Sequence, residues 1–228
     1  MSCTESIKWA LLSHVYDLGS RIFMLPFGGE GKVRARFLEL AGVSAGQRVL
    51  DVGCATGTLT WMAARRTAGG AGQCVGLDLS MAMLRQAVRK PRMVGRSPRG
   101  AEAPAFVCAD AARLPFPGEA FDRVISFFAV HELDTHARRS AITEFHRVLR
   151  PDGYLAVADY PIVATRGAPL LRAFVKLVEP RSAMEILRGS YLQDVDGLFL
   201  LEQTVSFLGG IGQVTIARKI SGGRRHTA

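Results

Sequence analysis

The sequence contains few cysteines, and they form no recognisable metal or redox motif. There are four, Cys3, Cys54, Cys74 and Cys108, and no two of them are spaced as C-x-x-C. This scatter argues against a structural zinc site and indicates reduced thiols of the kind found in the cytosol. Cys54 and Cys108 fall close to predicted strand ends, and the interpretation we favour for both is that of small buried hydrophobic residues.

Long apolar runs are also absent. No segment reaches the ~20 apolar residues of a membrane-spanning helix, and the N-terminus has no basic segment followed by a long apolar core. We therefore expect a cytoplasmic protein without a signal peptide. The 48% apolar and 21% charged content is typical of a soluble globular protein. A length of 228 residues favours one α/β domain over residues 1–228.

Acidic residues are outnumbered, with 20 Asp and Glu against 29 Lys and Arg, a net charge of +9. A basic surface attracts nucleic acid or anionic lipid. Much of the excess, however, lies in residues 89–100 and in the tail 222–228, and neither carries interleaved aromatics. We interpret both segments as solvated loops. The second interpretation is peripheral contact with an anionic membrane, and the third is binding of RNA. We do not expect a nucleic-acid partner.

The most informative stretch is residues 48–60. Its first five residues predict a short buried strand, Gly53 and Gly57 bracket a tight turn, and an apolar-faced helix follows. This is the layout of a mononucleotide-binding unit in an open α/β sheet. Glycine lets the backbone approach a ligand closely. Asp51 stands at the carboxyl end of the strand, where such sheets bind their ligands.

Two related nucleotide motifs do not fit. A phosphate-binding P-loop ends in Gly-Lys-Ser/Thr, but Gly57 is followed by Thr58 and Leu59. The dinucleotide motif G-x-G-x-x-G would fall on Gly53, Ala55 and Thr58, of which only the first is glycine. The pattern that fits is D-x-G-x-x-x-G.

This pattern resembles the first motif of class I S-adenosylmethionine-dependent methyltransferases, which usually carry glycine where this chain has Ala55. The resemblance covers about residues 14–160 and implies S-adenosylmethionine as cofactor, with S-adenosylhomocysteine as product. It also implies a Rossmann-like α/β fold: a doubly wound, mostly parallel, seven-stranded sheet with an antiparallel C-terminal hairpin. The cofactor contacts that it implies in this motif are Asp51, Gly53, Cys54, Ala55 and Gly57.

The second predicted strand, residues 74–79, ends in another acid. Asp78 lies 25 residues after Gly53, about where this unit places a carboxylate on the ribose hydroxyls. A helix N-cap is the alternative role, but Ser80 suits it better, so we favour ribose binding for Asp78. By the family resemblance, Leu79 and Met81 are cofactor contacts, and Met81 flanks the adenine unless it packs in the core.

The third predicted strand, residues 105–109, ends in Asp110-Ala111, with Leu-Pro-Phe soon after. This resembles the adenine-binding turn of the family, in which a carboxylate accepts from the exocyclic amine and a backbone N–H donates to the ring. We therefore assign Asp110 and Ala111 to adenine; Asp110 as a simple turn former is the alternative.

The fourth strand, residues 121–128, leads to the candidate acceptor side. The resemblance places Phe127 on the cofactor and Phe128, His131 and Tyr160 on the acceptor. Methyl transfer from a sulfonium requires mainly positioning and water exclusion, so no catalytic triad is needed.

His131 is the best candidate for a general base, because imidazole titrates near neutral pH; the alternative is that it only packs or caps. Glu132, Tyr160 and His14 are weaker candidates. We predict no metal site, since the motif H-E-x-x-H would need a histidine at Thr135.

The N-terminal part predicts an amphipathic helix over residues 4–18. Tyr16-Asp17 and the apolar segment after it resemble the N-terminal lid of quinone-biosynthesis and phospholipid methyltransferases, which gives a lid over residues 1–30. In that family a tyrosine can reach the amino-acid end of the cofactor; simple packing is the alternative for Tyr16. We expect residues 23–27 to form an apolar loop. Phe23 and Phe27 in it are acceptor contacts, unless the loop enters a bilayer or packs on the domain.

The remaining elements complete the fold class. The patterns predict helices over residues 32–41 and 135–149, an amphipathic helical stretch over residues 168–192, and strands over residues 154–160, 198–208 and 213–219.

The acceptor is the least determined part of the function. We favour a small lipophilic acceptor and C-methylation of a quinone, although Phe-Phe-Ala-Val-His-Glu-Leu after the fourth strand departs from the acceptor motif of that group. The alternatives are N-methylation of a phospholipid headgroup, a small soluble acceptor, or a non-catalytic protein that binds S-adenosylmethionine. An NAD oxidoreductase is a further alternative, and the sequence does not indicate an oligomeric state.

Overall fold

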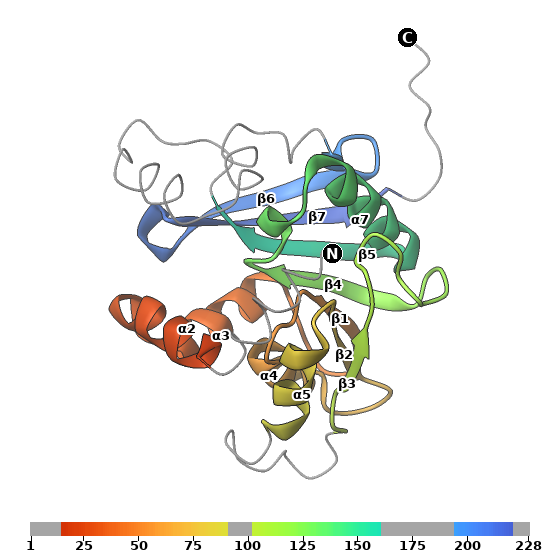
Figure 1. Ribbon diagram of the computed structural model, residues 1–228. Coiled ribbons are helices and arrows are strands. Elements are labelled where there is room, and N and C mark those ends of the chain that lie inside the picture. Colours follow the sequence, from red (N-terminus) through yellow and green to blue (C-terminus); the bar gives the residue numbers. More distant parts are fainter. Residues whose placement is uncertain (1–14, 91–101, 161–193, 221–228) are drawn as a thin grey trace.

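A computed structural model describes residues 15–90, 102–160 and 194–220 (Figure 1). The helices are α2 (Tyr16–Met24), α3 (Glu30–Leu40), α4 (Thr58–Thr67), α5 (Met81–Arg89) and α7 (Thr135–Val148), with short 3-10 helices η1 (Leu25–Phe27), η2 (Val130–Glu132) and η3 (Leu208–Gly210). The strands are β1 (Arg48–Val52), β2 (Gln73–Asp78), β3 (Ala105–Cys108), β4 (Phe121–Phe127), β5 (Leu149–Asp159), β6 (Phe199–Phe207) and β7 (Gly212–Lys219).

The strands form one seven-stranded sheet in the order β3-β2-β1-β4-β5-β7-β6. The first five strands in this order pair in parallel, while β7 pairs antiparallel with both β5 and β6. The predicted doubly wound sheet with an antiparallel C-terminal hairpin is therefore confirmed. The order reverses between β1 and β4, and ligands bind outside the carboxyl ends of the strands at such a point.

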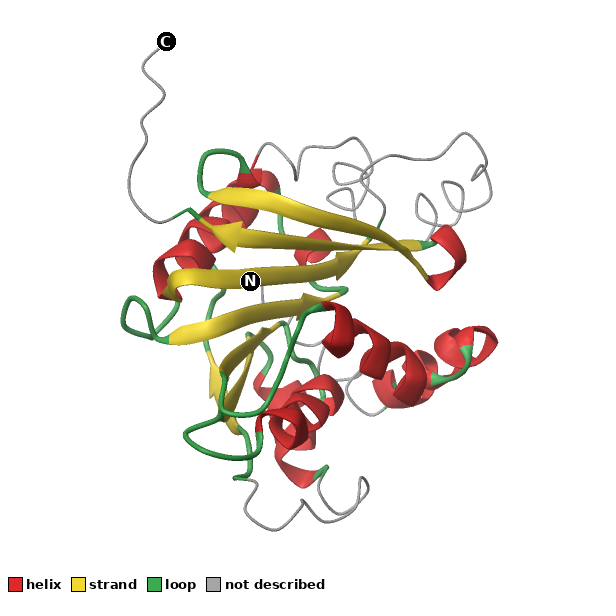
Figure 2. Cartoon of the chain, turned by 180° about the vertical axis from the view of Figure 1, so that it is seen from behind, coloured by secondary structure: helices red, strands yellow, loops and turns green. Residues whose placement is uncertain are grey.

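Helices cover both faces of the sheet, so its central strands are apolar on both sides (Figures 1 and 2). Adjacent residues of one strand enter different core clusters. Val49 of β1 and Ile125 of β4 pack with α3 and α4, whereas Leu50 and Val124 pack with α7. All four are fully buried. The hydroxyl of Ser80 accepts from the Met83 N–H and begins α5, the N-cap role predicted for it.

The apolar segment after Tyr16 is helical, which corrects the expected loop. The sequence analysis placed a helix end at Gly19, but α2 continues through it to Met24 and η1 follows. A glycine inside a helix costs only about 1 kcal/mol relative to alanine. The inward side of α2 offsets that cost, because Met24 is buried and the Ser20 hydroxyl bonds to Glu30 of α3.

Two further expectations need correction. Strand β5 begins at Leu149 rather than at residue 154, because Leu149 pairs with Phe121 and a register shift then accommodates the turn before Gly153. Cys108, which was expected to be buried, is exposed, whereas Cys54 is buried as expected.

Several predictions lie outside the described residues: the helix over residues 4–14, the stretch 168–192, most of the basic loop 89–100 and the tail. Within the described ranges, no helix combines the length and apolar character needed to cross a bilayer.

Candidate active site

The glycine turn after β1 has the backbone geometry that its sequence demands. Gly53 and Gly57 have φ values of 72° and 74°, which side chains disfavour. A Cβ on Gly53 would lie 2.3 Å from the Ala129 Cβ, and one on Gly57 would lie 2.7 Å from the Ala87 Cβ. Ala55, where the family usually has glycine, also has a positive φ of 48°. The glycine turn is thus tightly packed against Ala129 and Ala87, and its backbone is strained at Ala55.

Asp51 lies at the bottom of this turn as a buried carboxylate. It is 1% exposed, and the Thr60 hydroxyl of α4 donates to it at 2.6 Å. Burial raises the pKa of Asp51 to about 6, against the lowering effects of the Thr60 hydrogen bond and the Arg34 charge. Near neutral pH this carboxylate is therefore ionised in an apolar setting and would gain from a cationic partner.

Asp78 at the end of β2 supports the same turn. Its two carboxylate oxygens accept from the Ala55 N–H and the Ser80 N–H, both at 2.8 Å. Each oxygen can accept a second hydrogen bond, so the carboxylate can still receive hydroxyl groups of a ligand. Burial raises the pKa of Asp78, and the backbone hydrogen bonds oppose that rise.

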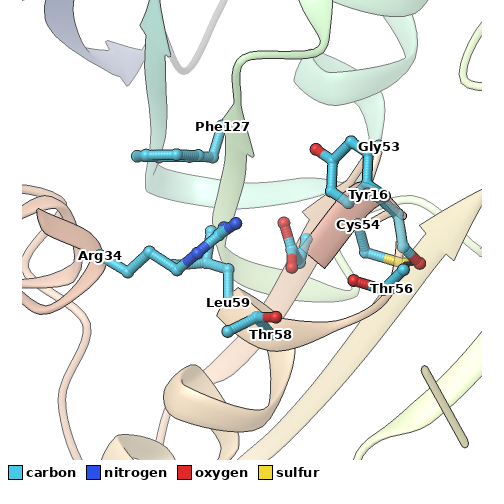
Figure 3. A pocket seen from close by; sticks show the side chains of 10 residues that line it. Tyr16, Arg34, Gly53, Cys54, Thr56, Thr58, Leu59 and Phe127 are labelled. Atoms are coloured by element: carbon cyan, nitrogen blue, oxygen red, sulfur yellow. Dashed lines mark hydrogen bonds between the residues drawn. The ribbon is translucent and has the colours of Figure 1, made fainter. Parts of the chain in front are cut away.

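A small hollow, partly open to solvent, lies over these groups (Figure 3). Its lining unites helix α2, helix α3, the glycine turn with the start of α4, and the ends of β1 and β4. The lining residues are Tyr16, Arg34, Asp51, Gly53, Cys54, Ala55, Thr56, Thr58, Leu59 and Phe127. Six of them were predicted as cofactor contacts, namely Tyr16, Asp51, Gly53, Cys54, Ala55 and Phe127.

Arg34 is the pocket residue of greatest consequence that the sequence analysis missed. Its side chain reaches into the pocket from α3 (Figure 3). Its Nε donates to Glu30 Oε1 at 3.1 Å, and one Nη donates to the Ser20 hydroxyl at 3.1 Å. The guanidinium carbon lies 4.9 Å from the centre of the Phe127 ring. The available signal in the sequence was the spacing, because Arg34 precedes Phe37 and Leu38 by three and four residues and so shares the apolar side of the helix. In the structure Arg34 is only 6% exposed.

Tyr16 faces the same charges from α2. Burial raises the pKa of its phenol, and the Arg34 guanidinium opposes this effect. The charges of Asp78 and His131 also act on it. Tyr16 is therefore within electrostatic range of both Asp78 and His131.

Lys90 fastens α2 to the glycine turn. Its Nζ donates to Asp17 of α2 at 2.8 Å and to the hydroxyls of Thr56 and Thr58 at 2.8 and 2.5 Å. Thr56 also donates to Asp17. The sequence analysis placed Lys90 in a solvated loop, which is wrong: it caps the end of α5 and is 4% exposed.

His131 of η2 and Asp159, the last residue of β5, form a buried pair. The His131 Nδ1 lies 2.8 Å from Asp159 Oδ1, and the His131 backbone N–H donates to Oδ2 at 3.0 Å. The Tyr160 backbone N–H also donates to this carboxylate. The imidazole is 5.0 Å from the Tyr160 ring, which in turn is 5.8 Å from the Phe128 ring. Three of the five residues predicted to face the acceptor, Phe128, Tyr160 and His131, thus form one aromatic group. The other two, Phe23 and Phe27, pair with each other instead, with ring centres 6.3 Å apart. Asp159 was missed.

Comparisons with known proteins agree with this geometry. A family profile described as "Methyltransferase domain" matches residues 49–153. An uncharacterised methyltransferase of Synechocystis is 32% identical over 90% of this chain and 91% of its own. The chain belongs to the class I S-adenosylmethionine-dependent methyltransferases.

Two further similarities bear on substrate and fold. A demethylmenaquinone methyltransferase of Thermus thermophilus is 37% identical over 64% of this chain, and the match spans 61% of that relative's length. A solved S-adenosylmethionine-dependent methyltransferase from Aquifex aeolicus is 21% identical, with a TM-score of 0.62 over 82% of this chain and 89% of that one. The second similarity concerns the fold alone.

The donor set of the pocket fits the cofactor of this methyltransferase family. A buried guanidinium and a buried carboxylate, Arg34 and Asp51, face the same hollow and complement the carboxylate and ammonium of a methionine moiety. Asp78 retains acceptor capacity for ribose hydroxyls.

The predicted adenine side lies outside this pocket. Leu79 and Met81 are 43% and 51% exposed, which leaves them free to cover an aromatic base. Asp110 accepts from the Ala112 N–H at 2.9 Å and so forms a turn. This bond leaves its other oxygen and the Ala111 N–H for the adenine role that the resemblance implies.

No cluster of three or more potential metal ligands occurs among the described residues of the methyltransferase.

Proposed function

We propose that this methyltransferase C-methylates a reduced quinone, that is, a hydroquinone ring with an apolar substituent. The observation that carries the proposal is the buried His131–Asp159 pair beside an aromatic group, whose Phe128 ring lies 5.1 Å from the ring of the pocket residue Phe127. Similarity to demethylmenaquinone methyltransferase over 64% of the chain supports the same acceptor class.

The cofactor pocket supplies position rather than chemistry. Arg34 and Asp51 hold the methionine end, Asp78 binds the ribose, and Tyr16 closes the pocket from α2. When bound, S-adenosylmethionine presents an electrophilic methyl group on its sulfonium. Fixing donor and acceptor in line can supply ~7–11 kcal/mol of barrier reduction, and the lid excludes water that would compete for the methyl group.

The histidine pair supplies the base that a hydroquinone requires. Asp159 accepts from Nδ1–H and so leaves Nε2, which lies 3.6 Å from the Glu132 carboxylate, as the acceptor atom of His131. Nε2 takes the hydroxyl proton, and the resulting phenolate raises the electron density on the adjacent ring carbon. The methyl group would pass to that carbon, with the carbon–sulfur electron pair staying on sulfur. The ring proton would then leave to water as the ring regains aromaticity, and His131 would return its proton to the phenolate oxygen. Phe128 and Tyr160 provide flat apolar surfaces for such a ring.

The proposal is tested by transfer of labelled methyl from S-adenosylmethionine to reduced demethylmenaquinone. We expect a methylated quinone by mass spectrometry, and a kcat that rises with pH as the base loses its proton. Asp159→Asn should lower kcat by up to about 10²–10⁴-fold, the usual contribution of a general base, because Asp159 positions that base. It should also move the rising limb to lower pH, because an anionic neighbour favours protonated imidazole.

Asp152→Asn is the matched control, since Asp152 lies on the same strand but 72% of its side chain is exposed. It should leave both rate and profile unchanged. Methylation of phosphatidylethanolamine with no product from the hydroquinone would contradict the proposal in favour of headgroup N-methylation. Binding of S-adenosylhomocysteine without turnover of any acceptor would favour a non-catalytic role.

A further inference from the structure

The outer face of α2 and η1 carries a cluster of exposed apolar side chains. Eleven large hydrophobic residues are exposed in the described part of the chain, and five of them fall within residues 15–25. Four lie at spacings of three and four residues, so they share one side of the helical segment. They are Val15, Leu18, Ile22 and Leu25, which are 54%, 60%, 63% and 72% exposed; we call them the outer stripe.

The opposite side of α2 is fixed to the protein, so the stripe is held outward. Asp17 bonds to Lys90, Ser20 bonds to Arg34 and Glu30, and Met24 is buried in the core. A helix usually turns its apolar side inward and its polar side to water. Here the polar side is used for the cofactor pocket, and the apolar side faces out. Figures 1 and 2 both show α2 at the outer edge of the molecule, beyond α3.

Basic side chains accompany the stripe. Arg21 lies on α2, and Lys32 and Arg36 are exposed on the neighbouring α3. Arg21 is paired at 3.5 Å with Glu30, and Arg36 is paired with Glu39. Over residues 15–39 there are four Lys and Arg against three Asp and Glu, and one of the four bases, Arg34, is buried in the pocket. The whole chain carries +9. Such a charge opposes self-association and favours an anionic partner.

We propose that the outer stripe docks this methyltransferase on an anionic lipid bilayer. Apolar side chains flanked by basic ones are the pattern of helices that lie in the headgroup layer of a membrane. The inference rests on the proposed function, because a hydroquinone with an apolar tail resides in the bilayer. Since the inner side of the same helix lines the cofactor pocket, docking would bring that pocket to the surface from which the acceptor enters.

The test compares binding to vesicles of phosphatidylcholine alone and of phosphatidylcholine mixed with phosphatidylglycerol. We expect cosedimentation with the mixed vesicles, weakened by salt. The double variant Leu18→Ser, Ile22→Ser should bind at least about tenfold more weakly, because two apolar side chains no longer enter the bilayer. The matched control is Leu200→Ser, Leu201→Ser on β6, where the side chains are 49% and 43% exposed; it should bind like the unmodified protein.

Three results would overturn the inference: no binding to mixed vesicles, equal loss in both double variants, or a dimer that Leu18→Ser, Ile22→Ser converts to a monomer. The last would assign the stripe to a second copy of the chain. A failure of membrane docking can be distinguished from a failure of the proposed function, because affinity for S-adenosylhomocysteine and turnover of a tail-free hydroquinone are measured without vesicles. Both should be unchanged in Leu18→Ser, Ile22→Ser if the stripe acts only through the membrane.

Discussion

Asp51 should lower the stability of the ligand-free protein near neutral pH. Its pKa of about 6 is raised from an ordinary 3.8 by burial. The folded state therefore holds this proton more tightly than the unfolded state. The free energy of unfolding contributed by Asp51 falls as pH rises from about 4 to about 6 and is constant above that range. The shift corresponds to roughly 3 kcal/mol.

The substitution Asp51→Asn removes the buried charge and should raise the free energy of unfolding. Asparagine can still accept from the Thr60 hydroxyl, but its amide needs an acceptor, which reduces the gain to about 1–3 kcal/mol. Urea unfolding of both proteins at several pH values measures the difference. We expect the difference to rise by roughly 3 kcal/mol between pH 4 and pH 7 and to be constant above that range. The same variant should bind S-adenosylhomocysteine more weakly, because the ligand ammonium loses its carboxylate.

Taking the difference between the two proteins cancels titrating groups that do not interact with Asp51. Asp78 is not one of these, because its charge acts on Asp51. Asp196→Asn is the control, since Asp196 is exposed, and it should show no pH-dependent difference. A variant that is less stable at pH 8 than the unmodified protein, or a difference independent of pH, would refute the reasoning. Unchanged ligand affinity would remove Asp51 from the binding site.

Two other substitutions test the turn and its support. Gly53→Ala should destabilise the protein by about 2–4 kcal/mol in urea unfolding, since it combines positive φ with a collision against Ala129. The control Gly29→Ala, with positive φ but open space around it, should destabilise the protein clearly less. Equal destabilisation by the two substitutions would contradict the packing argument. Lys90→Met should speed both the dissociation of S-adenosylhomocysteine and the amide hydrogen exchange of α2, because Asp17 loses its cationic partner. If both rates stay unchanged, Lys90 does not hold α2 in place.

The sheet could be predicted from sequence because its signals are local. Buried central strands are apolar without alternation, and Gly53, Gly57 and Ser80 determine turns and a helix start within a few residues. The carboxyl ends of parallel strands share one edge, so Asp51 and Asp78 could be assigned to the same region before any coordinates were known.

The missed residues depend on distant parts of the chain. Lys90 belongs to a basic run in the sequence, and only the packing of α5 against the glycine turn brings it to Asp17. Asp159 ends a strand that is simply apolar in sequence, and the parallel pairing of β4 with β5 brings it to His131. Helix α2 was misjudged because local rules treat Gly19 as an end, whereas tertiary contacts on its inner side determine its length.

Binding of S-adenosylhomocysteine to Arg34→Met, measured by calorimetry beside methylthioadenosine, tests the central claim most directly. Methylthioadenosine has the same nucleoside and sulfur but no amino-acid end. The account predicts that the variant loses at least about tenfold affinity for S-adenosylhomocysteine, or about 1.4 kcal/mol, and keeps its affinity for methylthioadenosine. Arg36→Met, exposed on the same helix, should change neither. Unchanged binding of S-adenosylhomocysteine, or equal loss for both ligands, would contradict the assignment of this pocket to the methionine end of the cofactor.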